Sequence, residues 1–254
     1  MAIKTDEAFV LTRMCFRETS MILTLFAKEA GKIKLLLKGV RGEKNPKLAR
    51  FEPFTKVSVV YYEKLRSDLH LGSQLEILDA QLGLRNQLSR IAFASYLTEL
   101  VDTLFAAQDP HEDVYDLLEA SFECLQHFTP STVARVFELK ILEKIGWLPM
   151  LQECAGCGTE DLFQSYFSPR QGGVLCLSCK AKDSSAFPVS KMTCQTLVYF
   201  LSHDLSDAVQ RELSPSSERE LARIGERFLR FHLDYPLRST RFLSEVRFLL
   251  APSR

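Results

Sequence analysis

Two pairs of cysteines constrain this chain more than any other feature of its sequence. They are Cys154 with Cys157 and Cys176 with Cys179, and 18 residues separate the two pairs. A Cys-x-x-Cys turn brings two thiolates to one ion, and four thiolates at about 2.3 Å from Zn²⁺ complete a tetrahedron. Because four protein sulfurs leave no position for water, the spacing predicts one structural Zn²⁺ rather than a catalytic metal.

Two other interpretations of these pairs fit the sequence less well. A redox-active pair usually opens a helix after a strand in a βαβ unit, and no such unit surrounds either pair. Ordinary thiols in a metal-free loop are the second alternative.

The chain has seven cysteines, an odd number, which argues against a disulfide framework. The other three lie in apolar segments and are expected to be core thiols: Cys15, Cys124 and Cys194.

Short segments with the composition of β-strands fill the first 80 residues. In one of them Ile33, Leu35 and Leu37 share one face, while Lys32, Lys34 and Lys38 share the other. Five strands with no helix between them predict a small barrel, since closure removes exposed sheet edges. The expected strands cover residues 8–16, 21–28, 32–38, 54–62 and about 65–78.

From about residue 82 the apolar period becomes helical. Helices are expected over residues 84–104, 114–125, 129–146, 190–202, 214–236 and 239–250. The fold class is therefore α+β and multidomain, with a β-barrel followed by a helical domain that contains an inserted four-cysteine zinc finger. The expected boundaries are 1–80 for the barrel, 81–150 and 186–254 for the two helical parts, and 151–185 for the cysteine module.

Charge is distributed unevenly, although 32 basic residues balance 32 acidic ones. Residues 28–50 carry eight Lys or Arg and two Glu, whereas residues 81–150 carry five basic and ten acidic groups. On a small barrel a basic track of this kind can follow a nucleic-acid backbone. A solvated strand face is the alternative interpretation. The candidate DNA-binding residues are Lys32, Lys34, Lys38, Arg41, Lys44, Lys47 and Arg50.

Aromatic residues are interleaved with this basic track, and one or two of them could stack on bases. Most occupy strand positions that should be buried, so the majority are expected in the core. The set comprises Phe9, Phe16, Phe26, Phe51, Phe54, Tyr61 and Tyr62.

No catalytic constellation emerges from the sequence. The five histidines are scattered, and the chain has no phosphate loop, dinucleotide fingerprint, Gly-x-Ser-x-Gly or His-Glu-x-x-His motif. We therefore expect no catalytic residues and no enzymatic activity. The sequence also lacks a secretory signal region and any apolar run near the roughly 20 residues of a membrane span. A cytoplasmic protein without membrane contacts is expected.

Several short motifs, taken in order, resemble the RecO family of bacterial recombination mediator proteins. They begin with Arg-Glu-Thr-Ser at 17–20 and Lys-Gly-Val-Arg at 38–41. Phe-Glu-Pro-Phe at 51–54 is similar to the Leu-x-Pro-Phe segment of that family. Residues 135–146 and 237–243 continue the resemblance through the helical part, so it covers essentially the whole chain. After Arg41 the sequence Gly-Glu-Lys-Asn-Pro departs from relatives, which often continue with Arg, Lys and Ser.

The resemblance implies an OB fold for the barrel, a structural zinc site and a non-enzymatic role in DNA repair near the nucleoid. Such proteins bind single- and double-stranded DNA, anneal complementary strands, associate with RecR and help RecA replace the single-stranded-DNA-binding protein. They also capture the acidic C-terminal tail of that protein, which ends in an aromatic residue. Arg135 matches a basic position associated with the tail pocket, and Phe137, Leu139 and Trp147 could contribute an apolar cleft.

Two functions from other classes remain open on the sequence alone. A zinc-stabilised protein-interaction module would leave the lysines as ordinary surface. An RNA-binding OB protein would prefer RNA over matched DNA through contacts to the 2′-hydroxyl.

Overall fold

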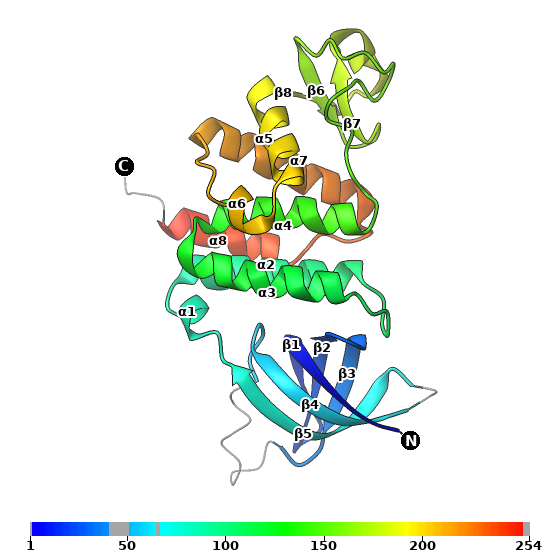
Figure 1. Cartoon of the computed structure of the whole chain (residues 1–254), viewed down its shortest axis with the longest axis vertical. Helices are drawn as coiled ribbons and strands as arrows, with labels where there is room; N and C mark the ends of the chain where they lie inside the picture. The colour runs from blue at the N-terminus through cyan, green and yellow to red at the C-terminus, as the bar shows by residue number, and fades with distance from the viewer. Residues whose placement is uncertain (1, 41–50, 65–66, 251–254) are drawn as a thin grey trace. The chain divides into compact units, whose positions relative to one another are not determined.

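The computed structural model describes residues 2–40, 51–64 and 67–250 (Figure 1). The chain divides into two compact units, one of residues 1–122 with 237–254 and the other of residues 123–236. Helical residues between 82 and 122 therefore group with the barrel, and the cysteine module groups with the later helices. Among the described residues, no helix is long and apolar enough to cross a membrane.

Five strands close into a barrel in the first unit, in the order β1-β2-β3-β5-β4. Neighbouring strands are antiparallel except β3 and β5, which are parallel and pair Lys34 with Leu69. A closed five-stranded barrel with this order is the OB fold, so the predicted fold class is confirmed. The strands are β1 (Ala2–Phe16), β2 (Ser20–Ala27), β3 (Gly31–Leu37), β4 (Lys56–Glu63) and β5 (Leu69–Asp79).

The barrel interior follows the alternation in the sequence. In β3, Ile33, Leu35 and Leu37 are buried in the core, while Lys34 is exposed on the other face. Strand β1 begins at Ala2, earlier than predicted, because its first residues pair with β4 from Glu63 to Lys56. These residues are mostly exposed, so this part of the strand carries no hydrophobic pattern.

Aromatic side chains on the outside of the barrel pack against the helices that follow it: α1 (Leu82–Arg85), α2 (Leu88–Leu104) and α3 (Glu112–His127). The Phe9 ring lies 5.1 Å from the Tyr115 ring and 5.2 Å from the Phe122 ring, both on α3. Phe26 lies 5.8 Å from Phe105, just after α2. The rings of Phe9 and Phe26 are therefore occupied within the fold.

Helix α8 (Ser239–Leu250) belongs to the first unit, and a carboxylate on α2 binds its N-terminus. Glu99 accepts hydrogen bonds from the backbone N–H groups of Arg238 and Ser239 at 2.8 and 2.7 Å, and from the Ser239 hydroxyl. A carboxylate at a helix N-terminus satisfies unpaired N–H groups and complements the helix dipole. This contact anchors a segment that is 140 residues away in sequence.

The second unit is built from helices α4 (Pro130–Lys144), α5 (Lys191–Ser202), α6 (Leu205–Ala208) and α7 (Pro215–His232). The predicted starts of α5 and α7 are confirmed, because the hydroxyls of Ser190 and Ser214 accept from backbone N–H groups of the first turn. Helix α4 is buried on all sides, including two charged residues.

The cysteine module carries a three-stranded sheet in the order β7-β6-β8. Its elements are β6 (Ser165–Ser168), β7 (Gly173–Cys176), the 3-10 helix η2 (Leu177–Lys182) and β8 (Phe187–Val189).

Candidate metal centre and DNA-binding surfaces

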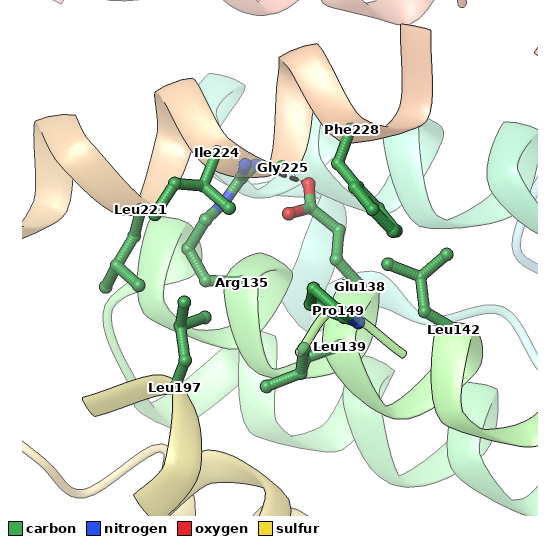
Figure 2. Close-up of a pocket in the computed structure, with 10 residues that line it drawn as sticks. All are labelled: Arg135, Glu138, Leu139, Leu142, Pro149, Leu197, Leu221, Ile224, Gly225 and Phe228. Carbon is green, nitrogen blue, oxygen red and sulfur yellow. Dashed lines mark ion pairs between the residues drawn. The ribbon is translucent and has the colours of Figure 1, made fainter. Parts of the chain in front are cut away.

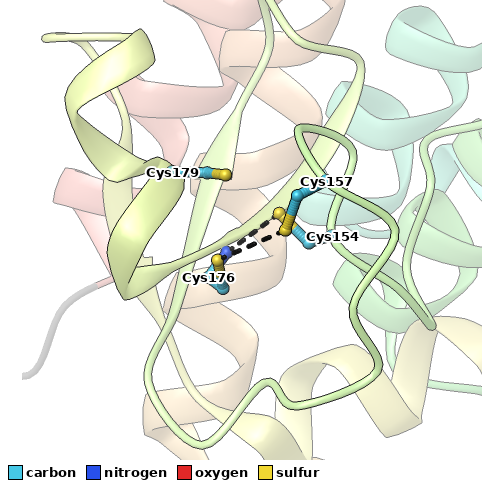
Figure 3. Close-up of side chains that lie close together, drawn as sticks. All are labelled: Cys154, Cys157, Cys176 and Cys179. Atoms are coloured by element: carbon cyan, nitrogen blue, oxygen red, sulfur yellow. Dashed lines mark hydrogen bonds between the residues drawn. The ribbon is translucent and has the colours of Figure 1, made fainter.

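The structure brings the four predicted cysteines together at one point of the module (Figure 3). Their sulfur atoms all lie within 4.8 Å of one another, and those of Cys157 and Cys176 are 3.8 Å apart. In a tetrahedron with metal–sulfur bonds near 2.3 Å, sulfurs are separated by about 3.8 Å. The four cysteines could therefore hold a metal ion without a large rearrangement.

Hydrogen bonds prepare part of this site for an anionic sulfur. Burial raises the pKa of the Cys154 thiol, but the N–H groups of Cys176 and Gly156 donate to its sulfur at 3.3 and 3.4 Å, and the pKa falls to about 6. Burial and the neighbouring sulfurs raise the pKa of Cys179 to about 12. Because crowded thiolates repel one another, a divalent cation would favour the fourfold deprotonated state.

The tight turn around the first cysteine pair depends on a small residue and a lysine. A Cβ atom on Gly156 would lie 3.0 Å from Cys179 Cβ and 3.1 Å from its sulfur. Lys182 donates from Nζ to the Gly156 carbonyl at 2.6 Å, which ties η2 to this turn. Asp183 accepts from the hydroxyls of Ser168 and Ser185 at 2.6 and 2.7 Å and connects η2 to β6.

The predicted DNA-binding lysines occupy two different environments in the barrel. Lys34 and Lys38 are exposed to solvent. Lys32 is only 16 % exposed, its Nζ lies 3.4 Å from Asp102 Oδ1, and it donates to the Asp102 carbonyl on α2. The remaining predicted residues lie outside the described part of the chain: Arg41, Lys44, Lys47 and Arg50.

Two further barrel lysines are directed at acidic residues of α3. Lys28 pairs with Glu112 and Asp116 at 3.2 and 3.3 Å. Lys56 pairs with Glu119 at 2.7 Å and with Glu7 of β1 at 3.0 Å. No local sequence pattern predicts these pairs. The acidic excess in residues 81–150 was the available signal, since those carboxylates neutralise basic groups of the barrel.

The aromatic residues of the basic track are mostly unavailable to a ligand. As expected, the majority are buried: Phe9, Phe26, Phe51, Phe54 and Tyr61. Phe16 and Tyr62 are partly exposed.

Arg135 lines a narrow pocket in the second unit (Figure 2). Its guanidinium pairs with Glu138 at 2.7 Å, and both side chains are less than a tenth exposed. The apolar part of the lining comes from α4, α5 and α7, and Pro149 completes it. The apolar lining residues are Leu139, Leu142, Pro149, Leu197, Leu221, Ile224 and Phe228.

The other residues predicted for this site lie elsewhere. Phe137 is completely buried and Trp147, partly exposed, stacks on His232 with ring centroids 4.7 Å apart. Gly225 of α7 was not predicted, although it approaches the ion pair closely. A Cβ atom there would lie 2.4 Å from Glu138 Oε2 and 2.9 Å from Arg135 Nη1.

These features define a class of protein, in which an OB-fold barrel is joined to a helical unit with a four-cysteine module. Comparison with known families agrees over nearly the whole chain. "Recombination protein O N terminal" matches residues 1–81, and "Recombination protein O C terminal" matches residues 85–241. The chain therefore belongs to the RecO family of recombination proteins.

Curated relatives carry the same family name. A protein of Alkaliphilus metalliredigens, named DNA repair protein RecO, is 30% identical over 236 residues, covering 92% of this chain and 95% of the relative. Proteins of the same name from Anaeromyxobacter sp. (strain K) and Pelotomaculum thermopropionicum are 31% and 30% identical. They cover 93% and 100% of this chain, and 94% and 97% of the relatives.

Proposed function

We propose that this protein is a non-enzymatic recombination mediator in DNA repair. It binds single- and double-stranded DNA and anneals complementary strands. With RecR, it helps to load RecA onto DNA coated by the single-stranded-DNA-binding protein. The observation that carries the proposal is the match of both parts of the chain to RecO proteins, together with an OB barrel that has one exposed lysine within β3, Lys34, and another just after it, Lys38.

The proposed DNA surface begins at the exposed end of β3. Lys34 points away from the barrel core, and Lys38 follows the end of the strand with its side chain exposed. The basic residues from Arg41 to Arg50 continue the same segment in sequence. Lys32 contributes less to DNA binding in this proposal, because its ammonium already pairs with Asp102. OB barrels bind strands through positively charged surfaces, to which exposed lysines contribute.

The metal in the cysteine module is proposed to be one Zn²⁺ with a structural role. Cys154, Cys157, Cys176 and Cys179 would hold it, and a complete set of thiolate ligands leaves no site for a reacting water. When bound, the ion would fix two loops of a module whose own buried core is small.

The pocket at Arg135 is proposed to bind the acidic, aromatic-ended tail of the single-stranded-DNA-binding protein. A cation beside apolar side chains suits such a tail, and Leu139 and Phe228 lie in the same lining. The cavity has a volume of about 20 Å³, enough for about one water by the roughly 10–15 Å³ that a water needs, and far too small for an aromatic ring. An aromatic end would therefore need the pocket to widen, with a tail carboxylate replacing Glu138 beside Arg135. Phe137 would act only by supporting α4.

The tail site can be tested with a variant that leaves neither member of the buried ion pair without its partner. Removing one member of a buried ion pair typically costs about 3–5 kcal/mol, so a single alanine variant confuses binding with folding. The double variant Arg135→Gln/Glu138→Gln removes both charges, keeps the shape of Glu138 and retains the inner part of the Arg135 side chain. We expect it to fold and to lose binding of a fluorescent tail peptide. Parental affinity in the folded variant would refute the site.

DNA binding by the barrel is tested with matched lysine pairs. Lys34→Gln/Lys38→Gln removes exposed charges, whereas Lys28→Gln/Lys56→Gln removes two charges that are paired with carboxylates. On single strands, the slope of log affinity against log salt should become shallower by about 1.4 in the first variant, at roughly 0.7 per lost phosphate contact. The second variant should keep the parental slope.

The same titration separates the proposal from its two alternatives. A protein-interaction module would show negligible affinity for DNA near 150 mM salt, and both lysine variants would behave like the parent. An RNA-binding protein would bind an RNA strand more tightly than the DNA strand of the same sequence.

A further inference from the structure

Four arginines form a row along the exposed face of α7. They recur at intervals of four, four and three residues, so they lie on one side of the helix. All four are exposed, while Leu221, Ile224 and Phe228 on the opposite face are buried. With a rise of about 1.5 Å per residue, the row extends over about 16 Å. We call these residues the arginine row: Arg219, Arg223, Arg227 and Arg230.

The arginine row is not neutralised by the fold. Some arginines elsewhere in the chain pair with carboxylates, as Arg13 does with Glu52 at 2.8 Å and Arg241 with Glu245 at 3.0 Å. Among the described residues, none of the four arginines of the row forms an ion pair. Glu220 of the same helix is instead engaged with Ser190, accepting from its N–H and its hydroxyl at 2.8 Å. Glu226 lies beside the row and offsets only part of its charge.

An aromatic ring of the cysteine module orders the middle of the row. The guanidinium carbons of Arg223 and Arg227 lie 4.2 and 5.0 Å from the centre of the Phe187 ring. Phe187 is buried on β8, with its ring 5.8 Å from that of Phe167, so it is a fixed platform. A guanidinium that stacks through its face can still donate from its edges, as Arg227 Nη1 does to the Ser185 carbonyl at 3.5 Å. Ordering before binding reduces the entropy that a ligand must overcome.

We propose that the arginine row binds the phosphate backbone of a nucleic-acid strand, as a second surface separate from the barrel. A straight row of about 16 Å is long enough to face several successive phosphates of one extended strand. Guanidinium groups bind phosphates through two parallel hydrogen bonds. The arginine row is an exposed helix face, and the pocket at Arg135 is lined from the opposite, buried face of α7. Regular phosphates therefore fit it better than an acidic peptide with anchoring side chains.

The second surface deepens the proposed function on which it rests, because annealing requires two strands. One strand would bind the barrel at Lys34 and Lys38, and the other would bind the arginine row. A protein with two such surfaces can hold both strands before they pair.

The test uses the outer arginines, which do not stack on Phe187, in the full-length protein. Arg219→Ala/Arg230→Ala should make the salt slope for single-stranded DNA shallower by about 1.4, at roughly 0.7 per phosphate, and slow annealing several-fold. Arg219→Lys/Arg230→Lys keeps the charges and should keep the slope. Lys191→Ala/Arg241→Ala removes two exposed charges elsewhere and should match the parent.

Each other outcome has a distinct meaning. If the outer-arginine variant binds and anneals like the parent while Lys34→Gln/Lys38→Gln fails, the arginine row is not a DNA surface and the proposed function stands. If it keeps DNA binding but loses binding of an oligoglutamate peptide, the row is a peptide site and the inference is wrong. If it loses DNA binding while the barrel variant does not, the row is supported and the barrel surface is refuted.

Discussion

The substitution Gly225→Ala provides a sharp test of the packing around the buried ion pair. In an ordinary helix interior this change stabilises by about 1 kcal/mol, because alanine has the higher helix propensity. Here the new Cβ would lie 2.4 Å from Glu138 Oε2, 2.9 Å from Arg135 Nη1 and 3.3 Å from Glu138 Cδ. An exposed carboxylate would turn away from such a contact at little cost. The Glu138 side chain is 4 % exposed and paired with Arg135, so its movement weakens the pair or compresses its neighbours.

The expected magnitude follows from these opposing effects. Overpacking a core by a methyl group typically costs about 1–3 kcal/mol, and losing a buried charge partner costs about 3–5 kcal/mol. The contact shifts the pair without removing either partner, so a gross cost near 2–4 kcal/mol is reasonable by these values. After subtracting the propensity gain, Gly225→Ala should destabilise the protein by about 1–3 kcal/mol.

Urea unfolding followed by circular dichroism measures this difference. Ala222→Gly, three residues earlier in α7, calibrates the propensity effect and should cost about 1 kcal/mol. In an Arg135→Gln/Glu138→Ala background both close contacts and both charges are removed, so Gly225→Ala should become neutral or stabilising there. A stabilising effect of Gly225→Ala in the parent protein would refute the reasoning.

Three further predictions concern the metal, a histidine and a capping carboxylate. Chelation or Cys176→Ser should unfold the cysteine module; metal-free protein with four free thiols and unchanged stability would contradict this. Burial lowers the pKa of His232 below 6.5, and its ring stacks on Trp147, the single tryptophan. The fluorescence of Trp147 should therefore change with a midpoint below pH 6.5, and this pH dependence should disappear in His232→Phe. The free energy of unfolding that neutral His232 contributes should be fully present above pH 6.5 and should fall as the pH is lowered through the pKa of the folded state. Burial would raise the pKa of Glu220, but hydrogen bonds from Ser190 lower it below 4.5. Glu220→Gln should therefore cost about 1 kcal/mol near neutral pH, and the difference from the parent should shrink as unfolding is measured below pH 4.5.

Much of the secondary structure could be predicted, because long segments carry a clear apolar period. The alternation of Ile33, Leu35 and Leu37 identified the inner face of β3 correctly. The bounds of short elements could not be predicted, because strand pairing and tertiary contacts rather than periodicity stabilise them. The strand Ser165–Ser168 and its two neighbours have three or four residues each. The helix Leu205–Ala208 is one turn long.

The candidate sites also differ in how far local sequence could predict them. Cysteine spacing is local, so the four cysteines that the structure brings together could be predicted as a cluster without a fold. The lysine pairs depend on contacts across 60 to 90 residues, such as Lys28 with Asp116, which no local pattern encodes. The sequence places Arg135 near a cleft, but its burial follows from the position of α4, whose residues Ser131–Leu139 are all buried. The spacing of Arg135 and Glu138 by three residues was the one local signal for their pairing.

The most direct test of the mediator function is strand annealing on protected DNA. Complementary oligonucleotides, one with a fluorophore and one with a quencher, are coated with the single-stranded-DNA-binding protein and mixed with this protein. We expect faster duplex formation by the parent, and loss of that acceleration in Lys34→Gln/Lys38→Gln but not in Lys28→Gln/Lys56→Gln. No acceleration by folded, metal-loaded parent protein would contradict the proposed function.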